Sequence, residues 1–317
     1  MLLKGKNAVI YGGGGAIGGA VARAFARHGA RVFLTGRNLR SVDKVATAIA
    51  AEGGLAEAAQ VDALDEQAVE EHLAAVVKKT GGIDISFNAI GISGAQVAEQ
   101  GLQGIALSEL PVESFVLPIA TYTRANFLTA RGAARRMIEK GSGVIMMHTP
   151  EPARLGVPLI GGMGPAWAAM EALSRNLSAE FAAHGVRAVC LRSTGIPETR
   201  TIEFVFGVQA KALGISREQF QGLMESMSHT RRSTTLAELT NAAVMIASDL
   251  ASGMTGTVAK RHRRKNRRLT HWRWLPLADP PRIALDDEAA RCVVCACRRK
   301  ASSRVRRLQS TCPSKVD

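Results

Sequence analysis

A run of glycines near the N-terminus has the residue type and spacing of a phosphate-binding turn. Residues 12–15 are all glycine, follow the apolar segment 7–11, and lead into apolar residues that recur at helical spacing past Gly18. Glycine lets the backbone approach a pyrophosphate closely enough to donate N–H groups, and the N-terminus of the following helix carries partial positive charge. The alternative, a plain glycine turn, does not explain four consecutive glycines that each cost ~0.5–1 kcal/mol in entropy. We therefore predict a dinucleotide site here.

The end of the second predicted strand bears on the choice between NAD and NADP. An acidic residue at this point hydrogen-bonds the ribose 2′-OH and repels a 2′-phosphate. This chain has Arg37 and no carboxylate, and a guanidinium pairs with phosphate through charge-assisted hydrogen bonds. The alternative is that Arg37 is a solvated loop cation. We predict NADP as the cofactor and rank NAD second.

The sequence of residues 11–18, Tyr-Gly-Gly-Gly-Gly-Ala-Ile-Gly, resembles the Thr-Gly-x-x-x-Gly-x-Gly turn of short-chain dehydrogenases/reductases. Tyr11 stands in place of the usual threonine, and Ala16 in place of the middle glycine. Asp62 matches the family carboxylate that meets the adenine amino group, and the sequence Asn-Ala-Ile-Gly from Asn88 to Gly91 resembles the family's Asn-Asn-Ala-Gly. The resemblance covers residues 1 to about 259 and implies one Rossmann-type domain that binds a nicotinamide dinucleotide. The cofactor-binding residues that we expect are Gly12, Gly14, Gly15, Ile17, Gly18, Arg37, Asp62, Asn88, Gly91 and Thr194.

The resemblance also implies a catalytic set, of which this chain keeps a part. In the family a tyrosine hydroxyl donates the proton to the carbonyl, a lysine four residues later lowers its pKa, a serine orients the substrate, and an asparagine completes the relay. Asn126 matches the asparagine. Met163 stands at the tyrosine position and Trp167 at the lysine position, and neither side chain donates a proton as the pair does. The serine position falls on Thr149 or Pro150.

These substitutions leave the identity of the proton donor open. The chain has two tyrosines, Tyr11 in the glycine turn and Tyr122 at the start of the helix that carries Asn126, and neither aligns with the missing one. A tuned donor contributes ~10²–10⁴ in rate, so its loss slows carbonyl reduction without forbidding hydride transfer. His148 ends a predicted strand and titrates near neutrality; the alternative is a histidine that is merely hydrogen-bonded there. If activity persists, we expect His148 and Thr149 to serve the substrate carbonyl.

Predicted strands and helices alternate along residues 1–259 and must position these groups. Strands are expected at 7–11, 31–35, 55–61, 83–87, 144–147 and 186–191. Helices are expected at 17–28, 42–51, 66–79, 121–140, 164–184 and 236–248. The alternation predicts an α/β fold with a parallel, doubly wound sheet and a ligand crevice at the carboxyl ends of the strands.

Residues 196–232 form a long insertion after the strand at 186–191. The insertion is rich in phenylalanine, leucine and methionine, and long segments at this rim of the sheet often act as lids. We predict a lid over an apolar substrate. The alternative is a helical hairpin that packs a small core of its own.

Composition points to a globular protein of a reducing compartment. The chain is 46% apolar and does not begin with the apolar core of a signal peptide. The longest uncharged apolar stretch, residues 155–170, is broken by prolines and glycines and falls short of the ~20 residues that a membrane span needs. Only Cys190 lies within residues 1–259. We expect a cytoplasmic protein without a membrane partner.

Residues 260–317 differ from the rest of the chain. They hold 17 of the 41 Lys and Arg but 5 of the 27 Asp and Glu, so they carry 12 of the 14 net positive charges. The net charge of the chain is therefore no argument that residues 1–259 bind nucleic acid. We predict a basic, disordered tail, and a shifted reading frame would produce it. The alternatives are a nucleic-acid contact through Trp272 and Trp274, and a zinc site at Cys292, Cys295 and Cys297 with Cys312. The cysteines lack a second well-spaced pair, and we expect no metal.

The functional prediction is an NADP-dependent oxidoreductase that transfers hydride to or from a carbonyl or hydroxyl of an apolar small molecule, with non-standard acid/base residues. The alternative is a catalytically inactive dinucleotide-binding protein. We expect a homo-oligomer if the final strand is intact, because members of the resembled family commonly associate through that edge of the sheet.

Overall fold

The computed structural model describes residues 1–228 and 230–260. These residues belong to one unit of the chain, Met1–Lys265. The predictions that concern residues 261–317, namely disorder, a shifted frame, a nucleic-acid contact and a zinc site, lie outside the described residues.

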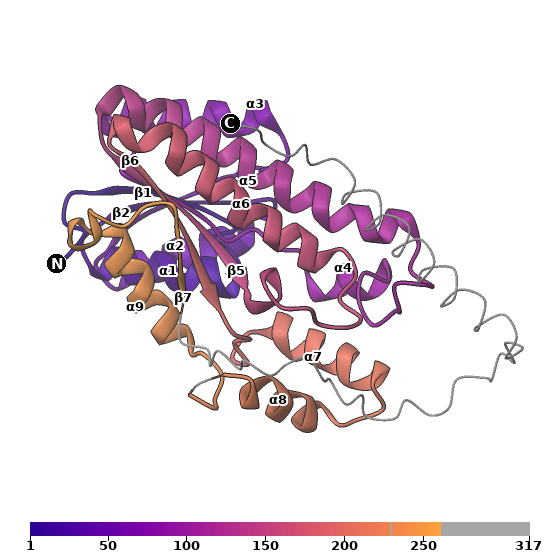
Figure 1. Cartoon of the computed structure of the whole chain (residues 1–317). Helices are drawn as coiled ribbons and strands as arrows, with labels where there is room; N and C mark the ends of the chain where they lie inside the picture. The colour runs from indigo at the N-terminus through magenta and orange to yellow at the C-terminus, as the bar shows by residue number, and fades with distance from the viewer. Residues whose placement is uncertain (229, 261–317) are drawn as a thin grey trace, which may run out of the picture. The chain divides into compact units, whose positions relative to one another are not determined.

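A seven-stranded parallel sheet forms the centre of this unit (Figure 1). Its strands are β1 (Asn7–Tyr11), β2 (Arg31–Gly36), β3 (Leu55–Gln60), β4 (Ile85–Asn88), β5 (Gly143–Pro150), β6 (Val186–Ser193) and β7 (Thr257–Lys260). The spatial order is β3-β2-β1-β4-β5-β6-β7, and every neighbouring pair is parallel. The order reverses between β1 and β4, so a crevice opens at the carboxyl ends of those two strands. The predicted doubly wound α/β fold is confirmed.

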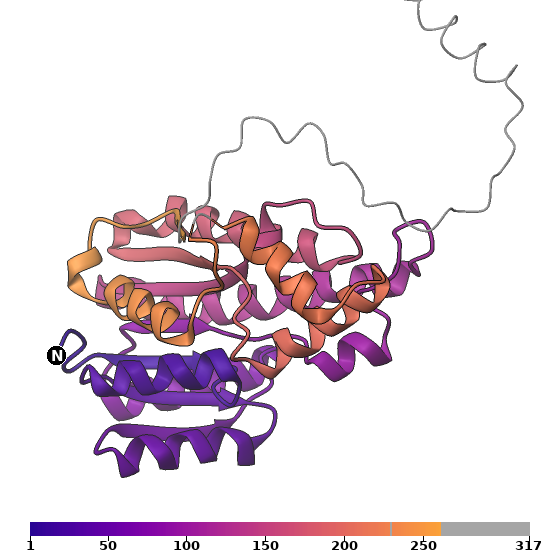
Figure 2. The same ribbon diagram turned by 90° about the horizontal axis from the view of Figure 1, so that it is seen from below.

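Helices cover both faces of the sheet. The long helices are α1 (Ala16–Arg27), α2 (Leu39–Ala51), α3 (Glu66–Thr80), α5 (Val112–Lys140), α6 (Met163–Phe181), α7 (Arg200–Ala212), α8 (Arg217–Ser226) and α9 (Leu236–Ala247). Apolar residues of α1, α2 and α9 pack into one core layer, and those of α3, α5 and α6 into the other. Figure 2 shows α9 lying beside α1 on the same face of the sheet. The strands at the centre of the sheet, β1, β2, β4, β5 and β6, are therefore mostly buried, whereas the edge strand β3 is partly exposed.

Short-range signals in the sequence explain where several helices begin and end. The Asp65 side chain accepts hydrogen bonds from the N–H groups of Gln67 and Ala68 and caps α3. Gly81 follows the last residue of α3 with φ +79°, and Gly29 closes α1 with φ +93°. Glycine adopts this left-handed conformation without a Cβ penalty, so these helix ends follow directly from the sequence.

The region before β5 differs most from the sequence prediction. Helix α5 starts at Val112, nine residues before the predicted start, and continues through Pro118. A Cβ on Gly162 would lie 1.8 Å from the Phe115 carbonyl oxygen, so this early part of α5 is packed directly on the start of α6. That tertiary contact stabilises a helical segment that contains Pro118, a residue that is unfavourable inside a helix. Tyr122 therefore lies well inside α5 instead of in its first turn.

Two shorter elements complete the sheet and its rim. Helix α4 (Gly94–Glu99), which the sequence prediction missed, follows β4 and is capped by Ser93. Strand β7 pairs with β6 from Val189 to Arg192. The described residues thus include a final strand at the sheet edge, directly before the change in composition at residue 260.

Candidate active site

A polar crevice lies at the carboxyl ends of β1, β2 and β4. We define it by the residues of the glycine turn, the end of β2 and the loops after β3 and β4 that line it. Six of the ten predicted cofactor-binding residues are among them: Gly12, Gly14, Gly15, Arg37, Asp62 and Gly91. The fold therefore gathers residues from four separate segments at the point where the strand order reverses, which is where such folds bind ligands.

The glycine turn has a conformation that other residues would disturb. Gly12 has φ +73°, and a Cβ there would lie 2.7 Å from the Ala89 carbonyl oxygen. A Cβ on Gly18 would lie 2.3 Å from the Gly12 carbonyl oxygen. Both glycines are needed for α1 to start this close to the turn. A Cβ at either position would clash with a backbone atom, and the backbone cannot move aside as a flexible side chain can.

The start of α1 supplies unpaired donors to the crevice. Gly15 is the N-cap residue, and no side chain caps the helix. The first N–H groups of a helix have no partner within it, and in α1 they belong to residues 16–18, which include the predicted Ile17 and Gly18. Uncapped N–H groups beside a glycine-lined cavity fit a phosphate anion.

Arg37 and Asp62 lie on the crevice at the ends of β2 and β3. Arg37 is exposed, and the described part of the chain contains no ion pair with its guanidinium. Asp62 accepts a hydrogen bond from the Leu64 N–H at 3.0 Å, which fixes the carboxyl group in the loop. A cation and a carboxylate therefore face the same crevice from neighbouring strands.

Two of the predicted cofactor contacts lie elsewhere. Asn88 is buried, donates to the Thr129 hydroxyl at 2.9 Å and accepts from the Ile90 N–H at 3.0 Å, so it joins the loop after β4 to α5. Thr194 exchanges hydrogen bonds with the hydroxyl and the N–H of Thr234. It does not line the polar crevice but an adjoining apolar pocket.

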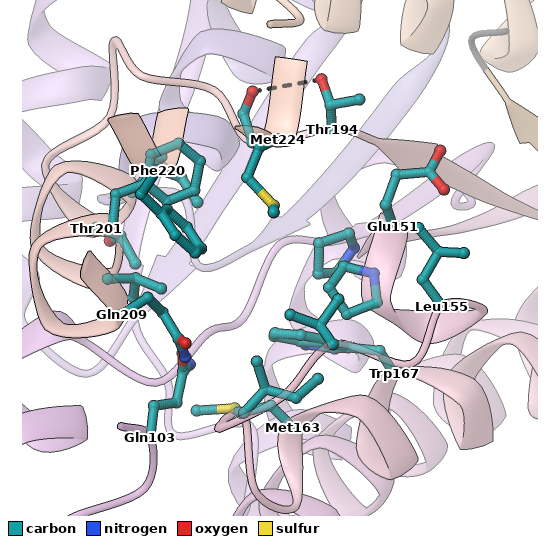
Figure 3. Close-up of a pocket in the computed structure, with 18 of the residues that line it drawn as sticks. Gln103, Glu151, Leu155, Met163, Trp167, Thr194, Thr201, Gln209, Phe220 and Met224 are labelled. Carbon is teal, nitrogen blue, oxygen red and sulfur yellow. Dashed lines mark hydrogen bonds between the residues drawn. The ribbon is translucent and has the colours of Figure 1, made fainter. Parts of the chain in front are cut away.

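We define the apolar pocket by its lining residues from α6, α7, α8 and the loops after β4, β5 and β6. Figure 3 shows Met163 and Trp167 of α6 on one side, Gln209 of α7 and Phe220 of α8 on the other, and the Met224 thioether between them. Ile92 lines both the apolar pocket and the polar crevice. The two cavities therefore share a wall.

The insertion predicted as a lid forms α7 and α8, which lie beyond the carboxyl ends of β5 and β6 (Figure 1). Phe206, Ala210 and Phe220 form a small core between these helices. The same two helices contribute Ile202, Phe206 and Met224 to the apolar pocket. The insertion thus has its own core and also forms one wall of the cavity.

Met163 and Trp167 occupy the positions where the resembled family has its tyrosine and lysine, and both line the apolar pocket. The Trp167 ring packs edge-on against Tyr122, with 6.2 Å between centroids. The Trp167 side chain also acts to lower the pKa of the Tyr122 hydroxyl. Trp167 therefore holds a residue of α5 in place.

Tyr122 is the polar group of the pocket that the sequence prediction missed. Its hydroxyl oxygen accepts a hydrogen bond from the Ile92 N–H at 3.3 Å. Burial raises the pKa of Tyr122, while the hydrogen bond from Ile92 and the Trp167 side chain act in the opposite direction. The signal available in the sequence was its spacing of four residues from Asn126, which places both on one face of a helix.

Thr149 does not face either cavity. Its side chain is fully buried, and its hydroxyl donates to Glu171 at 2.9 Å and contacts the Cys190 thiol at 3.3 Å. Glu171 in turn forms a buried ion pair with Arg192. The sequence left the serine position open between Thr149 and Pro150. Of these two residues, Pro150 lines the apolar pocket. This geometry corrects the role expected of Thr149, whose hydroxyl belongs to a core network.

His148 also lies away from both cavities. Its Nε2 is 2.9 Å from the Ser193 hydroxyl, and burial lowers the pKa of His148 to about 4. The alternative stated for this residue was a histidine that is merely hydrogen-bonded at the strand end, and the contact with Ser193 supports that alternative. His148 is therefore not placed to exchange a proton with a molecule in the apolar pocket.

The depressed pKa of His148 gives a testable effect on stability. Between pH 6.5 and 4 the unfolded chain takes up a proton at this residue that the folded chain does not, so the free energy of unfolding falls as pH falls. We expect His148→Gln to reduce the loss in thermal midpoint between pH 6.5 and 4. The control His184→Gln removes an exposed histidine and should retain the wild-type loss; identical curves for all three proteins would contradict the assignment.

Asn126 lies in α5, fully buried. Its Nδ2 donates to the Tyr122 carbonyl oxygen at 2.9 Å, and its Oδ1 has no hydrogen-bond partner in the described chain. The Asn126 side chain is thus hydrogen-bonded to the backbone of the preceding turn of α5, which carries Tyr122. Its predicted part in a catalytic relay remains a prediction.

The described residues also bear on two other kinds of feature, a membrane span and a metal site. No helix in residues 1–228 and 230–260 is long and apolar enough to cross a membrane. Within the same residues, no group of three or more histidine, cysteine, aspartate or glutamate side chains is arranged to hold a metal ion.

Comparison with known proteins gives one consistent result. The family model described as enoyl-(acyl carrier protein) reductase matches residues 14–260. A short chain aldehyde dehydrogenase of Euphorbia lathyris is 29% identical over 258 residues, covering 80% of this chain and 85% of the relative. Gluconate 5-dehydrogenase of Gluconobacter oxydans is 28% identical over 256 residues, covering 81% of this chain and 93% of the relative.

Solved structures agree with the sequence matches. A 7α-hydroxysteroid dehydrogenase in complex with NADH and 7-oxo glycochenodeoxycholic acid superposes with a TM-score of 0.70 at 25% identity. The match covers 81% of this chain and 92% of that protein. Sequence and structure thus agree over the same four-fifths of the chain.

Proposed function

The chain belongs to the short-chain dehydrogenase/reductase family of NAD(P)-dependent oxidoreductases, and we propose that it uses NADP and acts on a carbonyl or hydroxyl group of an apolar small molecule. The observation that carries this proposal is the pair of adjoining cavities, one polar and lined by the glycine turn, the other apolar. When bound, the reduced nicotinamide supplies a hydride to a carbonyl carbon.

The residues of the polar crevice fit the cofactor. The glycine turn and the uncapped N–H groups of α1 suit a pyrophosphate, which a Cβ at Gly12 or Gly18 would exclude by moving the turn. Arg37 would pair with the 2′-phosphate and Asp62 would meet the adenine amino group. The absence of a carboxylate at the end of β2 supports NADP over NAD.

The apolar pocket supports an apolar substrate, and one detail refines its class. Gln209 is buried in the wall, donating to Gln103 at 3.1 Å and to the Leu159 carbonyl oxygen at 3.0 Å. Figure 3 shows the two amide groups facing each other. Both partners accept hydrogen bonds, so both bonds are made by the Nε2 group of Gln209. The other polar atom of the amide, Oε1, has no hydrogen-bond partner in the described chain. Gln209 lines the apolar pocket, and we infer that a small rotation of its amide lets Oε1 accept from a ligand. The pocket then suits an apolar molecule with one hydroxyl or N–H donor besides its reacting carbonyl.

We expect Gln209→Leu to change substrate preference. The comparison uses two ketones that differ only in a distal hydroxyl, and the measured quantity is the ratio of their kcat/KM values. One hydrogen bond contributes about 0.5–1.5 kcal/mol, so the preference for the hydroxylated ketone should fall roughly 2- to 12-fold. The control Gln103→Leu leaves Gln209 Oε1 in place, so it should keep more of the preference for the hydroxylated ketone than Gln209→Leu does. If Gln209→Leu had the wild-type ratio of kcat/KM values, a contact between Gln209 Oε1 and the distal hydroxyl would be excluded.

The insertion and the sheet edge support two further parts of the proposal. Helices α7 and α8 form a wall of the apolar pocket, which suits a lid that excludes water during the reaction. Strand β7 is present at the edge of the sheet, so the edge expected to support a homo-oligomer is available.

The test of the proposed function is oxidation of NADPH by the purified full chain with a panel of apolar ketones and aldehydes. Cofactor binding is measured separately by protein fluorescence. Turnover that saturates with substrate is the expected result. Tight cofactor binding without turnover on any member of the panel would favour the alternative, a dinucleotide-binding protein without redox activity.

A further inference from the structure

The hydroxyl of Tyr122 lies where the two cavities meet. Tyr122 lines the apolar pocket. Its hydroxyl oxygen would lie 3.7 Å from a Cβ on Gly91, which lines the polar crevice. The N–H group that binds this oxygen belongs to Ile92, which lines both cavities. A carbonyl in the apolar pocket that approaches the shared wall therefore meets this hydroxyl.

The hydrogen bond of the Tyr122 hydroxyl leaves its proton available. The oxygen accepts a hydrogen bond from the Ile92 N–H at 3.3 Å. No acceptor for the hydroxyl proton is found in the part of the chain that the structure describes. A phenol that accepts a hydrogen bond and has an unused proton is arranged to donate to a ligand, and the same N–H donor stabilises the phenolate that remains.

We propose that Tyr122, projecting from α5, is the proton donor of this enzyme in place of the hydroxyl that is absent at Met163. The inference rests on the proposed function. In the reduction, the carbonyl carbon accepts the hydride and its two electrons from the reduced nicotinamide, and the carbonyl oxygen takes the proton of the Tyr122 hydroxyl. The O–H bond of Tyr122 breaks, the product is the alcohol, and the phenolate recovers a proton from water.

Other polar groups of the pocket are less well placed. Figure 3 shows the Glu151 carboxylate turned away from the centre of the pocket. Thr194 is engaged with Thr234. Trp167 is a positioning residue, since its ring packs edge-on against the Tyr122 ring.

The first experiment compares Tyr122→Phe with Tyr11→Phe in the full chain. Both changes remove one hydroxyl from a buried ring, but the Tyr11 hydroxyl has no hydrogen-bond partner among residues 1–228 and 230–260 and lines neither cavity. Removing a positioned general acid costs ~10²–10⁴ in rate, so we expect kcat of Tyr122→Phe to fall by that factor while NADPH affinity, measured by fluorescence, stays the same. Tyr11→Phe should keep wild-type kcat.

The second readout does not depend on turnover. The carbonyl stretch of ¹³C-labelled 2-decanone is recorded by difference infrared spectroscopy with each cofactor-free protein. Hydrogen bonding from Tyr122 should lower the stretching frequency in the wild type and in Tyr11→Phe, and this shift should be absent in Tyr122→Phe.

The outcomes separate this inference from the proposed function. Absence of turnover in the wild type together with a Tyr122-dependent infrared shift would reject the proposed function and keep the hydroxyl contact. Turnover by Tyr122→Phe within a few-fold of wild type would overturn the inference and keep the proposed function. The same infrared spectrum in wild type and Tyr122→Phe, or no bound ketone in either, would also overturn the inference.

Discussion

Replacing Gly18 with alanine will greatly weaken cofactor binding. The added Cβ would lie 2.3 Å from the Gly12 carbonyl oxygen, so the turn and the start of α1 must separate. The N–H groups that suit the pyrophosphate then lose their common orientation. A displacement of about 1 Å at such a site costs on the order of 10²-fold, and we expect the Kd for NADPH, measured by protein fluorescence, to rise at least that much.

Gly222→Ala is the matched control for this experiment. Gly222 lies in α8, where a Cβ would meet nothing within 4 Å. Alanine is favoured over glycine within a helix by ~1 kcal/mol, so this variant should fold at least as well as the wild type and bind NADPH normally. Circular dichroism of Gly18→Ala shows whether the fold persists. A folded Gly18→Ala protein with wild-type affinity would show that the turn does not hold the cofactor.

The fold could be predicted from sequence because its signals are local. Glycines at helix ends, the glycine turn and the alternation of strand and helix patterns each lie within a short window. They suffice to predict a parallel sheet with a crevice at its switch point. The six predicted residues that line the polar crevice followed from the same signals, since each lies in a segment that follows a strand.

The catalytic side chains could not be predicted in the same way. Thr149 and Pro150 alternate in direction along β5, so a one-residue uncertainty in alignment exchanges a core residue for a cavity residue. Tyr122 reaches the cavity only because α5 starts at Val112 and packs against α6. That packing brings together Tyr122, Trp167 and the loop after β4, which are distant in sequence. Contacts of this kind are properties of the tertiary structure.

Replacing Arg37 with glutamate will reverse the preference for the cofactor. Arg37 lies on the polar crevice at the end of β2. A charge-assisted hydrogen bond contributes about 1.5–3 kcal/mol, so the loss of the guanidinium should weaken NADPH binding about 10- to 150-fold, and repulsion between the new carboxylate and the 2′-phosphate adds to this loss. The same carboxylate can accept a hydrogen bond from the ribose 2′-OH of NADH, whose affinity should rise.

Arg40→Glu controls for the change in net charge. Arg40 is also exposed and lies three residues further on, in α2, outside the lining of the polar crevice. Each variant alters the charge of the protein by the same amount, so any general field effect is shared and should weaken as salt screens it. Fluorescence titration of both proteins with NADPH and NADH at low and high salt measures the four affinities. Reversal confined to Arg37→Glu and retained at high salt would assign the 2′-phosphate contact to this guanidinium. Tighter binding of NADH than NADPH by the wild type would instead show that Arg37 is a solvated cation and that NAD is the cofactor.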